Sequence, residues 1–233
     1  MQYLDFDENE LKSLGGLDTA KEISGQPKLW EKTWKTFINQ QNDLSAYLNK
    51  VYEHKELEII LTGAGSSAFI GEALTGIFSR NTNRFVKAIS TTDIVSHPLD
   101  NLSPEKPTLL ISFARSGNSP ESIATVQLSN KICKRIYHLI ITCNPDGELA
   151  HLGNGNNNYI IILPPESNDK SLAMTGSFTS MLLTGLLIAR IQDVKANERQ
   201  ISCATGMGIK VLKEYAHKLR LYSDLGFQRA VFL

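Results

Sequence analysis

The sequence predicts an α/β fold in which an N-terminal helical extension precedes a doubly wound, five-stranded parallel sheet. Short apolar runs alternate with longer helical segments through the middle of the chain, which is the pattern of strand–helix–strand units. These runs are continuously apolar, as expected of strands that are covered on both faces. The region before them shows only helical periodicity.

The strand candidates are rich in Ile, Val and Leu, and a polar turn follows each of them. Helical spacing of apolar residues is clearest after the first and third candidates and after the last one. We expect strands over residues 58–62, 84–89, 108–113, 137–142 and 159–163, with the start of another over residues 227–233. We expect helices over residues 8–14, 19–24, 26–52, 68–79, 120–134, 176–192 and 199–222.

These elements divide the chain into a helical extension over residues 1–52, a sheet domain over residues 53–196 and, over residues 197–233, a linker helix with the start of a truncated second domain. In the extension, Pro27 suits the first turn of the long helix. The linker helix is predicted to be amphipathic, with an inner face formed by Ile201, Ala204, Val211, Tyr215 and Leu219.

Charge and hydropathy exclude several classes of partner. The 24 Lys and Arg residues balance the 24 Asp and Glu residues, so no overall field attracts nucleic acid or an anionic membrane. The longest apolar stretch, residues 181–191, is far shorter than the roughly 20 residues that cross a bilayer. The three cysteines form no CxxC pair, and residues 1–10 lack a secretory signal. We expect a cytoplasmic protein without nucleic-acid or membrane partners, and no cofactor or metal is indicated.

A glycine- and serine-rich loop follows the first predicted strand. Residues 63–68 read Gly-Ala-Gly-Ser-Ser-Ala and open a helix, where glycines permit a tight turn and free amides favour an anion. The spacing also fits the loose GxGxxA dinucleotide fingerprint, which expects an acidic residue about 20 positions further on. The nearest candidate, Asp93, comes 28 positions after Gly65, in a predicted loop. Dinucleotide binding is therefore the weaker alternative.

A second polar loop follows the third predicted strand over residues 114–122, which read Ala-Arg-Ser-Gly-Asn-Ser-Pro-Glu-Ser. Ser119 suits a helix N-cap, Pro120 the first helical position and Glu121 the positive end of the dipole, so a well-capped helix alone would explain it. If the first and third strands are neighbours at the topological switch point, both loops open into one cleft. Amides, hydroxyls and two helix N-termini can hold a phosphate there without a basic patch.

The two loops carry a family resemblance. The chain resembles the sugar isomerase (SIS) family, which has a flavodoxin-like sheet, and more closely its tagatose-6-phosphate ketose/aldose isomerase type, also described as galactosamine-6-phosphate deaminase. The matching segments are LTGAGSSAFIGE over residues 61–72, LLISFARSGNSPES over residues 109–122, ITCNPDG over residues 141–147 and LAMTGSFTSM over residues 172–181.

The resemblance implies a phosphate site whose hydroxyl groups come from Ser67, Ser116 and Ser119. Thr175 is implied to lie beside the sugar, although it also suits an ordinary helix cap. Gly176 stands where relatives carry serine or lysine, which leaves the identity of the sugar open. The implied substrate-binding residues are Gly65, Ser66, Ser67, Arg115, Ser116, Gly117, Asn118, Ser119 and Thr175.

The resemblance also implies a homodimeric or larger enzyme that isomerises or deaminates a hexose or hexosamine 6-phosphate through an enediol-like intermediate. This chemistry needs a carboxylate base and an acid, often a histidine. The catalytic pair is expected in a second SIS domain beyond Leu233, so the 233-residue chain is not expected to be active alone. Within the chain, the weak candidates are Glu72, Glu121, Glu148, Glu166 and His97.

Two other functional classes stay open. A non-catalytic phosphosugar-sensing module would use the same two loops. The helix containing Trp30 and Trp34, however, is neither basic nor arranged as the helix-turn-helix that is usual in regulators. A nucleotide-linked oxidoreductase comes third, because its fingerprint is incomplete.

Overall fold

The computed structural model describes residues 1–152, 157–229 and 231. Its five-stranded sheet is parallel throughout, and the strand order β4-β3-β5-β6-β7 is that of doubly wound, flavodoxin-like folds. The fold class predicted from the sequence is therefore confirmed. The strands are β3 (Glu58–Gly63), β4 (Phe85–Ala88), β5 (Thr108–Ala114), β6 (Ile136–Thr142) and β7 (Asn158–Ile162).

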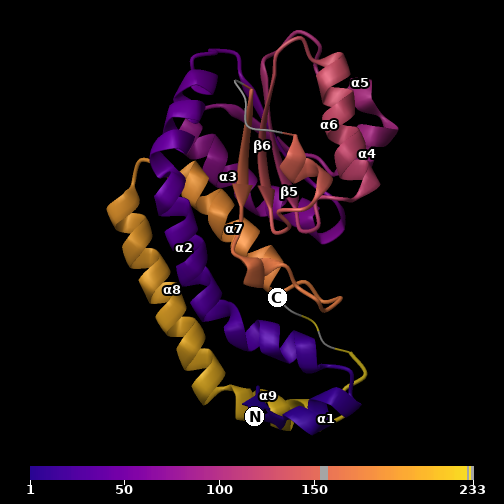
Figure 1. Cartoon of the computed structure of the whole chain (residues 1–233), viewed down its shortest axis with the longest axis vertical. Helices are drawn as coiled ribbons and strands as arrows, with labels where there is room; N and C mark the ends of the chain where they lie inside the picture. Colours follow the sequence, from indigo (N-terminus) through magenta and orange to yellow (C-terminus); the bar gives the residue numbers. More distant parts are fainter. Residues whose placement is uncertain (153–156, 230, 232–233) are drawn as a thin grey trace.

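Helices cover both faces of the sheet, which explains why its strands are continuously apolar. Helices α2, α3 and α7 lie on one face, and α4, α5 and α6 lie on the other (Figure 1). These helices are α2 (Leu17–Tyr52), α3 (Ala68–Thr82), α4 (Thr91–Ser96), α5 (Pro98–Asn101), α6 (Pro120–Ile132) and α7 (Gly176–Ala189). Short 3-10 turns are η1 (Gly65–Ser67), η2 (Glu148–His151) and η3 (Pro165–Ser167).

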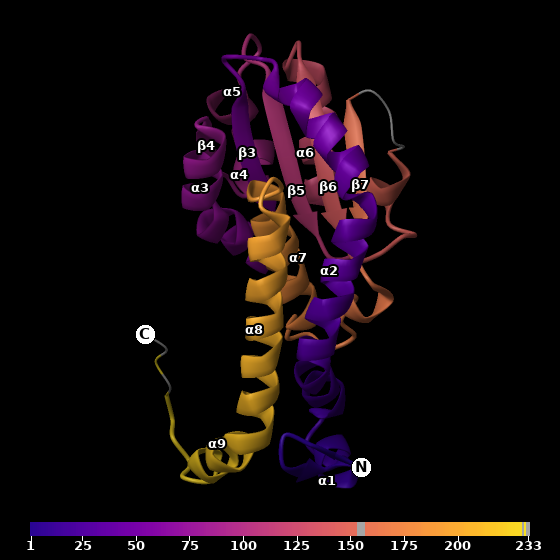
Figure 2. The same ribbon diagram turned by 90° about the vertical axis from the view of Figure 1, so that its left-hand side faces the viewer.

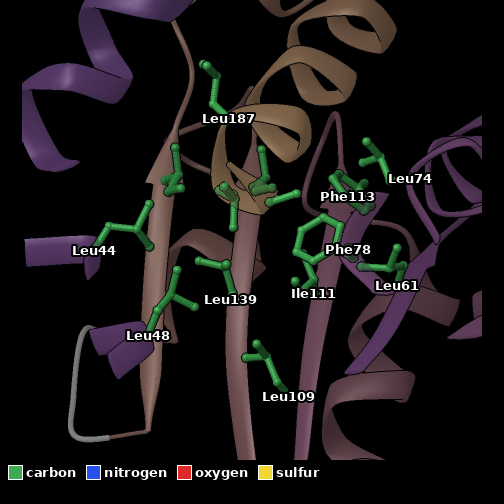
Figure 3. Packing of buried hydrophobic residues seen from close by; sticks show 14 of the residues in the cluster. Leu44, Leu48, Leu61, Leu74, Phe78, Leu109, Ile111, Phe113, Leu139 and Leu187 are labelled. Atoms are coloured by element: carbon green, nitrogen blue, oxygen red, sulfur yellow. The ribbon is translucent and has the colours of Figure 1, made fainter. Parts of the chain in front are cut away.

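The largest part of the core lies between the sheet and the layer of α2, α3 and α7. Figure 3 shows Leu44 and Leu48 of α2, Phe78 of α3 and Leu187 of α7 gathered around Leu139 of β6. Each of these side chains is at most 3% exposed. Full burial of such a side chain is worth about 1.5–3 kcal/mol. The long N-terminal helix is therefore part of the core of the sheet domain.

The apolar run over residues 181–191 belongs mostly to α7, where Met181, Leu187 and Ile188 are buried. Its hydrophobicity thus serves contact with the sheet. Within the part of the chain that the structure describes, no helix combines the length and apolarity of a membrane span.

Helix α2 is longer than predicted. It runs over 36 residues and merges the two helices that were predicted over residues 19–24 and 26–52. Pro27 therefore lies inside the helix, and the prediction that it occupies a first turn is wrong. Proline removes a backbone hydrogen bond, and α2 bends in its N-terminal third (Figure 1). Helix α8 packs closely here: a Cβ on its Gly208 would lie 3.1 Å from Pro27 Cγ and 2.8 Å from Trp30 Cζ3. This tertiary packing outweighs the local helix-breaking tendency.

The first residues of the chain and α9 lie together at the end of α2 and α8 that is remote from the sheet (Figure 2). Arg220 of α9 donates hydrogen bonds to the backbone oxygen of Asp5 and, over 2.9 Å, to Glu10 Oε1. The predicted first helix is present, and a short hairpin that was not predicted precedes it. The elements are β1 (Gln2–Tyr3), β2 (Phe6–Asp7), α1 (Glu8–Ser13), α8 (Val194–Glu214) and α9 (Ala216–Ser223).

The linker helix differs from the prediction in two respects. It is divided at Tyr215 into α8 and α9 instead of being continuous. Its buried residues are Asn197, Ile201 and Thr205, and α8 packs mainly against α2. Of the predicted inner face, Ile201 is buried, whereas the exposed residues are Ala204, Val211, Tyr215 and Leu219.

The strand expected over residues 227–233 is not formed in its described part. Phe227, Gln228, Arg229 and Val231 have no strand conformation, and the other three positions lie outside the described residues. A strand requires a hydrogen-bonded neighbour, and no described strand pairs with this segment.

His138 on β6 makes stability depend on pH. The side chain is 2% exposed, and its Nε2 lies 2.9 Å from Asn130 Oδ1, as suits a neutral ring. Burial lowers the pKa of His138 from 6.5 to about 4. Between these values the unfolded chain binds a proton that the folded chain excludes, so stability falls as the pH falls.

We therefore expect wild type to lose more unfolding free energy than His138→Gln between about pH 7 and about pH 5. Urea denaturation at both pH values measures this difference. Parallel pH dependence of the two proteins would show that His138 does not titrate on unfolding.

Candidate functional site

The candidate site lies where two loops leave the carboxyl ends of β3 and β5. These strands are direct neighbours, and Gly63 at the end of β3 pairs with Phe113 of β5. Because β4 lies beyond β3 and β6 lies beyond β5, the strand order reverses between them. The fold thus brings the two loops identified in the sequence to one switch point.

The first loop is shaped by its glycines. A Cβ on Gly63 would lie 2.7 Å from the backbone carbonyl carbon and oxygen of Ser67, so the chain turns back this closely only with glycine. Gly65 has a φ of +55°, in the left-handed region that glycine favours, and it begins η1. Ser67 is buried, whereas Gly65 and Ser66 are exposed. The loop therefore leads directly into the amide-rich N-terminus of α3.

The second loop turns at Gly117, whose φ is +66°. The backbone amide of Asn118 donates to Ser116 Oγ over 3.3 Å. Ser119 occupies the N-cap position of α6 as predicted, but its Oγ donates to Ser122 Oγ over 2.6 Å and caps no backbone amide. The amide groups in the first turn of α6 therefore donate no hydrogen bond to the Ser119 side chain.

The loop between β6 and η2 supports the second loop. Asn144 Nδ2 donates to the backbone oxygen of Ser116 over 3.0 Å, and Asn118 Oδ1 accepts from the Glu148 amide over 2.8 Å. A Cβ on Gly147 would lie 3.0 Å from the Cα atom of Gly117 and still closer to the Ser116 oxygen. The Asn-Pro-Asp-Gly turn over residues 144–147 can be recognised in the sequence. Its supporting role cannot, because the second loop lies about 30 residues earlier in the chain.

Asp169 connects the second loop to α7. Its backbone oxygen accepts from Arg115 Nη1 over 2.6 Å. Its carboxylate accepts from the amides of Gly176 (3.1 Å) and Ser177 (2.8 Å) and from Ser177 Oγ (2.6 Å). The Asp169 carboxylate therefore caps α7. Thr175 occupies the N-cap position, in agreement with its alternative interpretation as a helix cap, but its side chain makes no capping hydrogen bond. Thr175 Oγ1 is instead buried without a hydrogen-bond partner among the described residues.

The electrostatics of this edge favour an anion. Arg115 contributes a guanidinium group whose buried Nε has no hydrogen-bond partner in the described part of the chain. The N-termini of α3 and α6 add partial positive charge. Cys143, at the end of β6, contributes no thiolate, because burial raises its pKa to about 12. The site can thus bind an anion, and Cys143 is not a nucleophile at neutral pH.

Among the residues that the structure describes, none is singled out as the catalytic acid or base. The hydrogen bond from Lys32 lowers the pKa of Glu166, which makes this carboxylate a weaker base. Glu121 lies in the first turn of α6 at the positive end of the dipole. Across the described residues, no three His, Cys, Asp or Glu side chains gather to hold a metal ion. The remaining candidates are all exposed: Glu72, Glu148 and His97.

Comparison with known proteins decides the family. The family model of the SIS domain matches residues 50–191, more than half of the chain. The chain belongs to the SIS domain family. This SIS-domain chain is 42% identical over 228 residues to D-galactosamine-6-phosphate deaminase AgaS of Shewanella sp. (strain ANA-3). The similarity covers 96% of the chain but 58% of that relative, so the chain spans little more than half the relative's length.

Solved structures agree with this family. A Clostridium novyi NT protein assigned as a tagatose-6-phosphate ketose/aldose isomerase superposes with a TM-score of 0.94 at 43% identity. This alignment covers 98% of the SIS-domain chain and 59% of that protein. The tagatose-6-phosphate ketose/aldose isomerase of Escherichia coli superposes with a TM-score of 0.75 at 36% identity. That alignment covers 84% of the SIS-domain chain and 56% of the E. coli protein. The resemblance inferred from the loop motifs is confirmed.

Gly147 offers a test of the packing between the two loops. We expect Gly147→Ala to destabilise the protein by about 1–3 kcal/mol, because the added methyl group meets backbone atoms of Ser116 and Gly117. Chemical denaturation measures the change. Gly206→Ala on α8 is the matched control, since no heavy atom lies within 4 Å of its added Cβ. We expect this control to gain about 0.5–1 kcal/mol from helix propensity. Equal stability of the two variants would contradict the close approach.

Proposed function

We propose that this SIS-domain chain carries the phosphosugar site of an isomerase or deaminase of the tagatose 6-phosphate or galactosamine 6-phosphate type. The supporting observation is the pair of serine loops. They follow the adjacent strands β3 and β5 and lead into the N-termini of α3 and α6. The names of the Shewanella and E. coli relatives point to the same class of sugar phosphate.

In this proposal, the phosphate group accepts hydrogen bonds from Ser67, Ser116 and Ser119 and from backbone amides of both loops. The two helix dipoles stabilise its negative charge without a cluster of lysines. The Ser119 hydroxyl, which donates to Ser122 in this structure, turns to the phosphate instead. Binding through the phosphate orients the sugar and lowers the entropic cost of the chemical step.

The sugar itself is proposed to lie toward Thr175, whose hydroxyl has no hydrogen-bond partner among the described residues. Proton transfer through an enediol requires a carboxylate base. Asp169 is the buried carboxylate of this region, but three donors from α7 occupy its oxygens, so we assign it a structural role. The base is proposed to come from another part of a longer protein or from a neighbouring subunit. Homo-oligomerisation and a cytoplasmic location stay predictions.

A dinucleotide is a poorer ligand for this site. Asp93 lies in the first turn of α4, not in the predicted loop, and its side chain is exposed. The structure thus offers no acidic residue at the end of β4 for a ribose hydroxyl within the described residues. A phosphosugar-sensing module would bind the same ligands without turnover.

The phosphate assignment is tested at Ser116. We expect Ser116→Ala to bind galactosamine 6-phosphate more weakly by roughly 1–3 kcal/mol, because the charged phosphate group loses the hydrogen bond that the Ser116 hydroxyl donates. Isothermal titration calorimetry measures the affinity, and unphosphorylated galactosamine should bind poorly to both proteins.

Ser202→Ala, on the exposed side of α8, is the matched control and should bind like wild type. Equal affinity of wild type and Ser116→Ala for galactosamine 6-phosphate would refute the assignment. Saturation by NAD instead of sugar phosphates would favour the nucleotide-linked alternative.

A further inference from the structure

The N-terminal helix α2 holds the loop between β7 and α7, residues 163–175, through a carboxylate. Glu22 Oε1 accepts from the backbone amides of Lys170 (2.6 Å) and Ser171 (3.2 Å). The Ser171 hydroxyl donates to the second oxygen, Oε2. One carboxylate thus orders two consecutive residues that are 148 and 149 positions away in the sequence. Charge-assisted hydrogen bonds of this kind are stronger than neutral ones.

Further contacts of α2 surround this one. Lys32 pairs with Glu166 in η3, at the beginning of the same loop. Trp30 Nε1 donates over 3.1 Å to Thr179 Oγ1, in the first turns of α7. A Cβ on Gly176 would lie 3.1 Å from Leu29 Cδ2, so α2 also lies close to the start of α7. Helix α2 therefore contacts both ends of the loop and its middle.

The residues that Glu22 orders lie next to Asp169. Asp169 accepts from Arg115 of the second serine loop and caps α7 at Gly176 and Ser177. A continuous chain of hydrogen bonds and backbone thus leads from Glu22 to the serine loop and to the residues beside Thr175. Almost all of α2, including Glu22, lies outside residues 50–191, which match the SIS domain.

We propose that Glu22 is a positioning residue, through which the N-terminal helix sets the sugar end of the site. This inference rests on the proposed function. Glu22 orders Lys170 and Ser171, which keeps Asp169 on the α7 N-terminus and so places the Thr175 hydroxyl. The proposed phosphate ligands Ser67, Ser116 and Ser119 make no hydrogen bond to Asp169 among the described residues, and only Arg115 connects their loops to it. We therefore expect phosphate binding to depend little on Glu22.

The experiment compares two ligands on the 233-residue chain. In Glu22→Ala, we expect galactosamine 6-phosphate to bind about tenfold more weakly, while inorganic phosphate binds within about twofold of wild type. Phosphorus NMR titration measures both affinities. Glu22→Gln should restore most of the sugar-phosphate affinity, because its amide oxygen still accepts from the two backbone amides. Glu31→Ala removes the same charge from an exposed position on α2 and should bind both ligands like wild type.

Equal sugar-phosphate affinity in wild type and Glu22→Ala, or an equal loss for both ligands, would overturn the inference. Amide hydrogen exchange gives a second readout that needs no ligand. We expect faster exchange in Glu22→Ala at Lys170 and Ser171 and also at Gly176 and Ser177. Acceleration confined to the first pair would show that Glu22 does not act on α7. If wild type binds no sugar phosphate, the proposed function fails, while hydrogen exchange still decides whether Glu22 holds the loop.

Discussion

The parallel pairing of β3 with β5 is the constraint on which the rest of this site depends. The pairing extends to Gly63 opposite Phe113, so the chain leaves both strands at the same level of the sheet. Each strand is buried along its whole length, and covering both faces requires crossover helices. Two of these helices, α3 and α6, begin where the strands end. The proposed binding of an anion at this edge therefore rests on sheet topology and the helix dipole together.

Short backbone distances then determine the shape of the loops. Gly63 and Gly147 both stand where a Cβ would collide with backbone atoms, and backbone cannot move aside as a flexible side chain can. The buried carboxylate of Asp169 adds a polar connection, since it satisfies two amides of α7 that would otherwise lack partners. The site is thus shaped by features on four loops, although two of them supply the proposed phosphate ligands. Such a preformed arrangement is common in small-molecule sites.

How well an element could be predicted depended on where its contacts lie. Each of the five sheet strands was placed within one residue at either end, because buried parallel strands show as continuous apolar runs. The start of helix α2 was harder to predict, because Pro27 suggests a first turn. Its close packing against Gly208 of α8, inside the helix, is visible only in the fold. The inner face of α8 was also misjudged, since periodicity shows an apolar stripe without showing what covers it.

The sequence by itself determined the strands, the two glycine- and serine-rich loops and the family, because these depend on residues that are close together along the chain. Tertiary structure decided which other residues support the loops. Asp169 meets Arg115 across 54 positions, and Glu22 meets Lys170 across 148. Neither acidic residue stands in a motif, and each is an ordinary polar residue when its neighbours in sequence are considered alone. Their roles follow from hydrogen bonds between segments that only the folded sheet and helix α2 bring together.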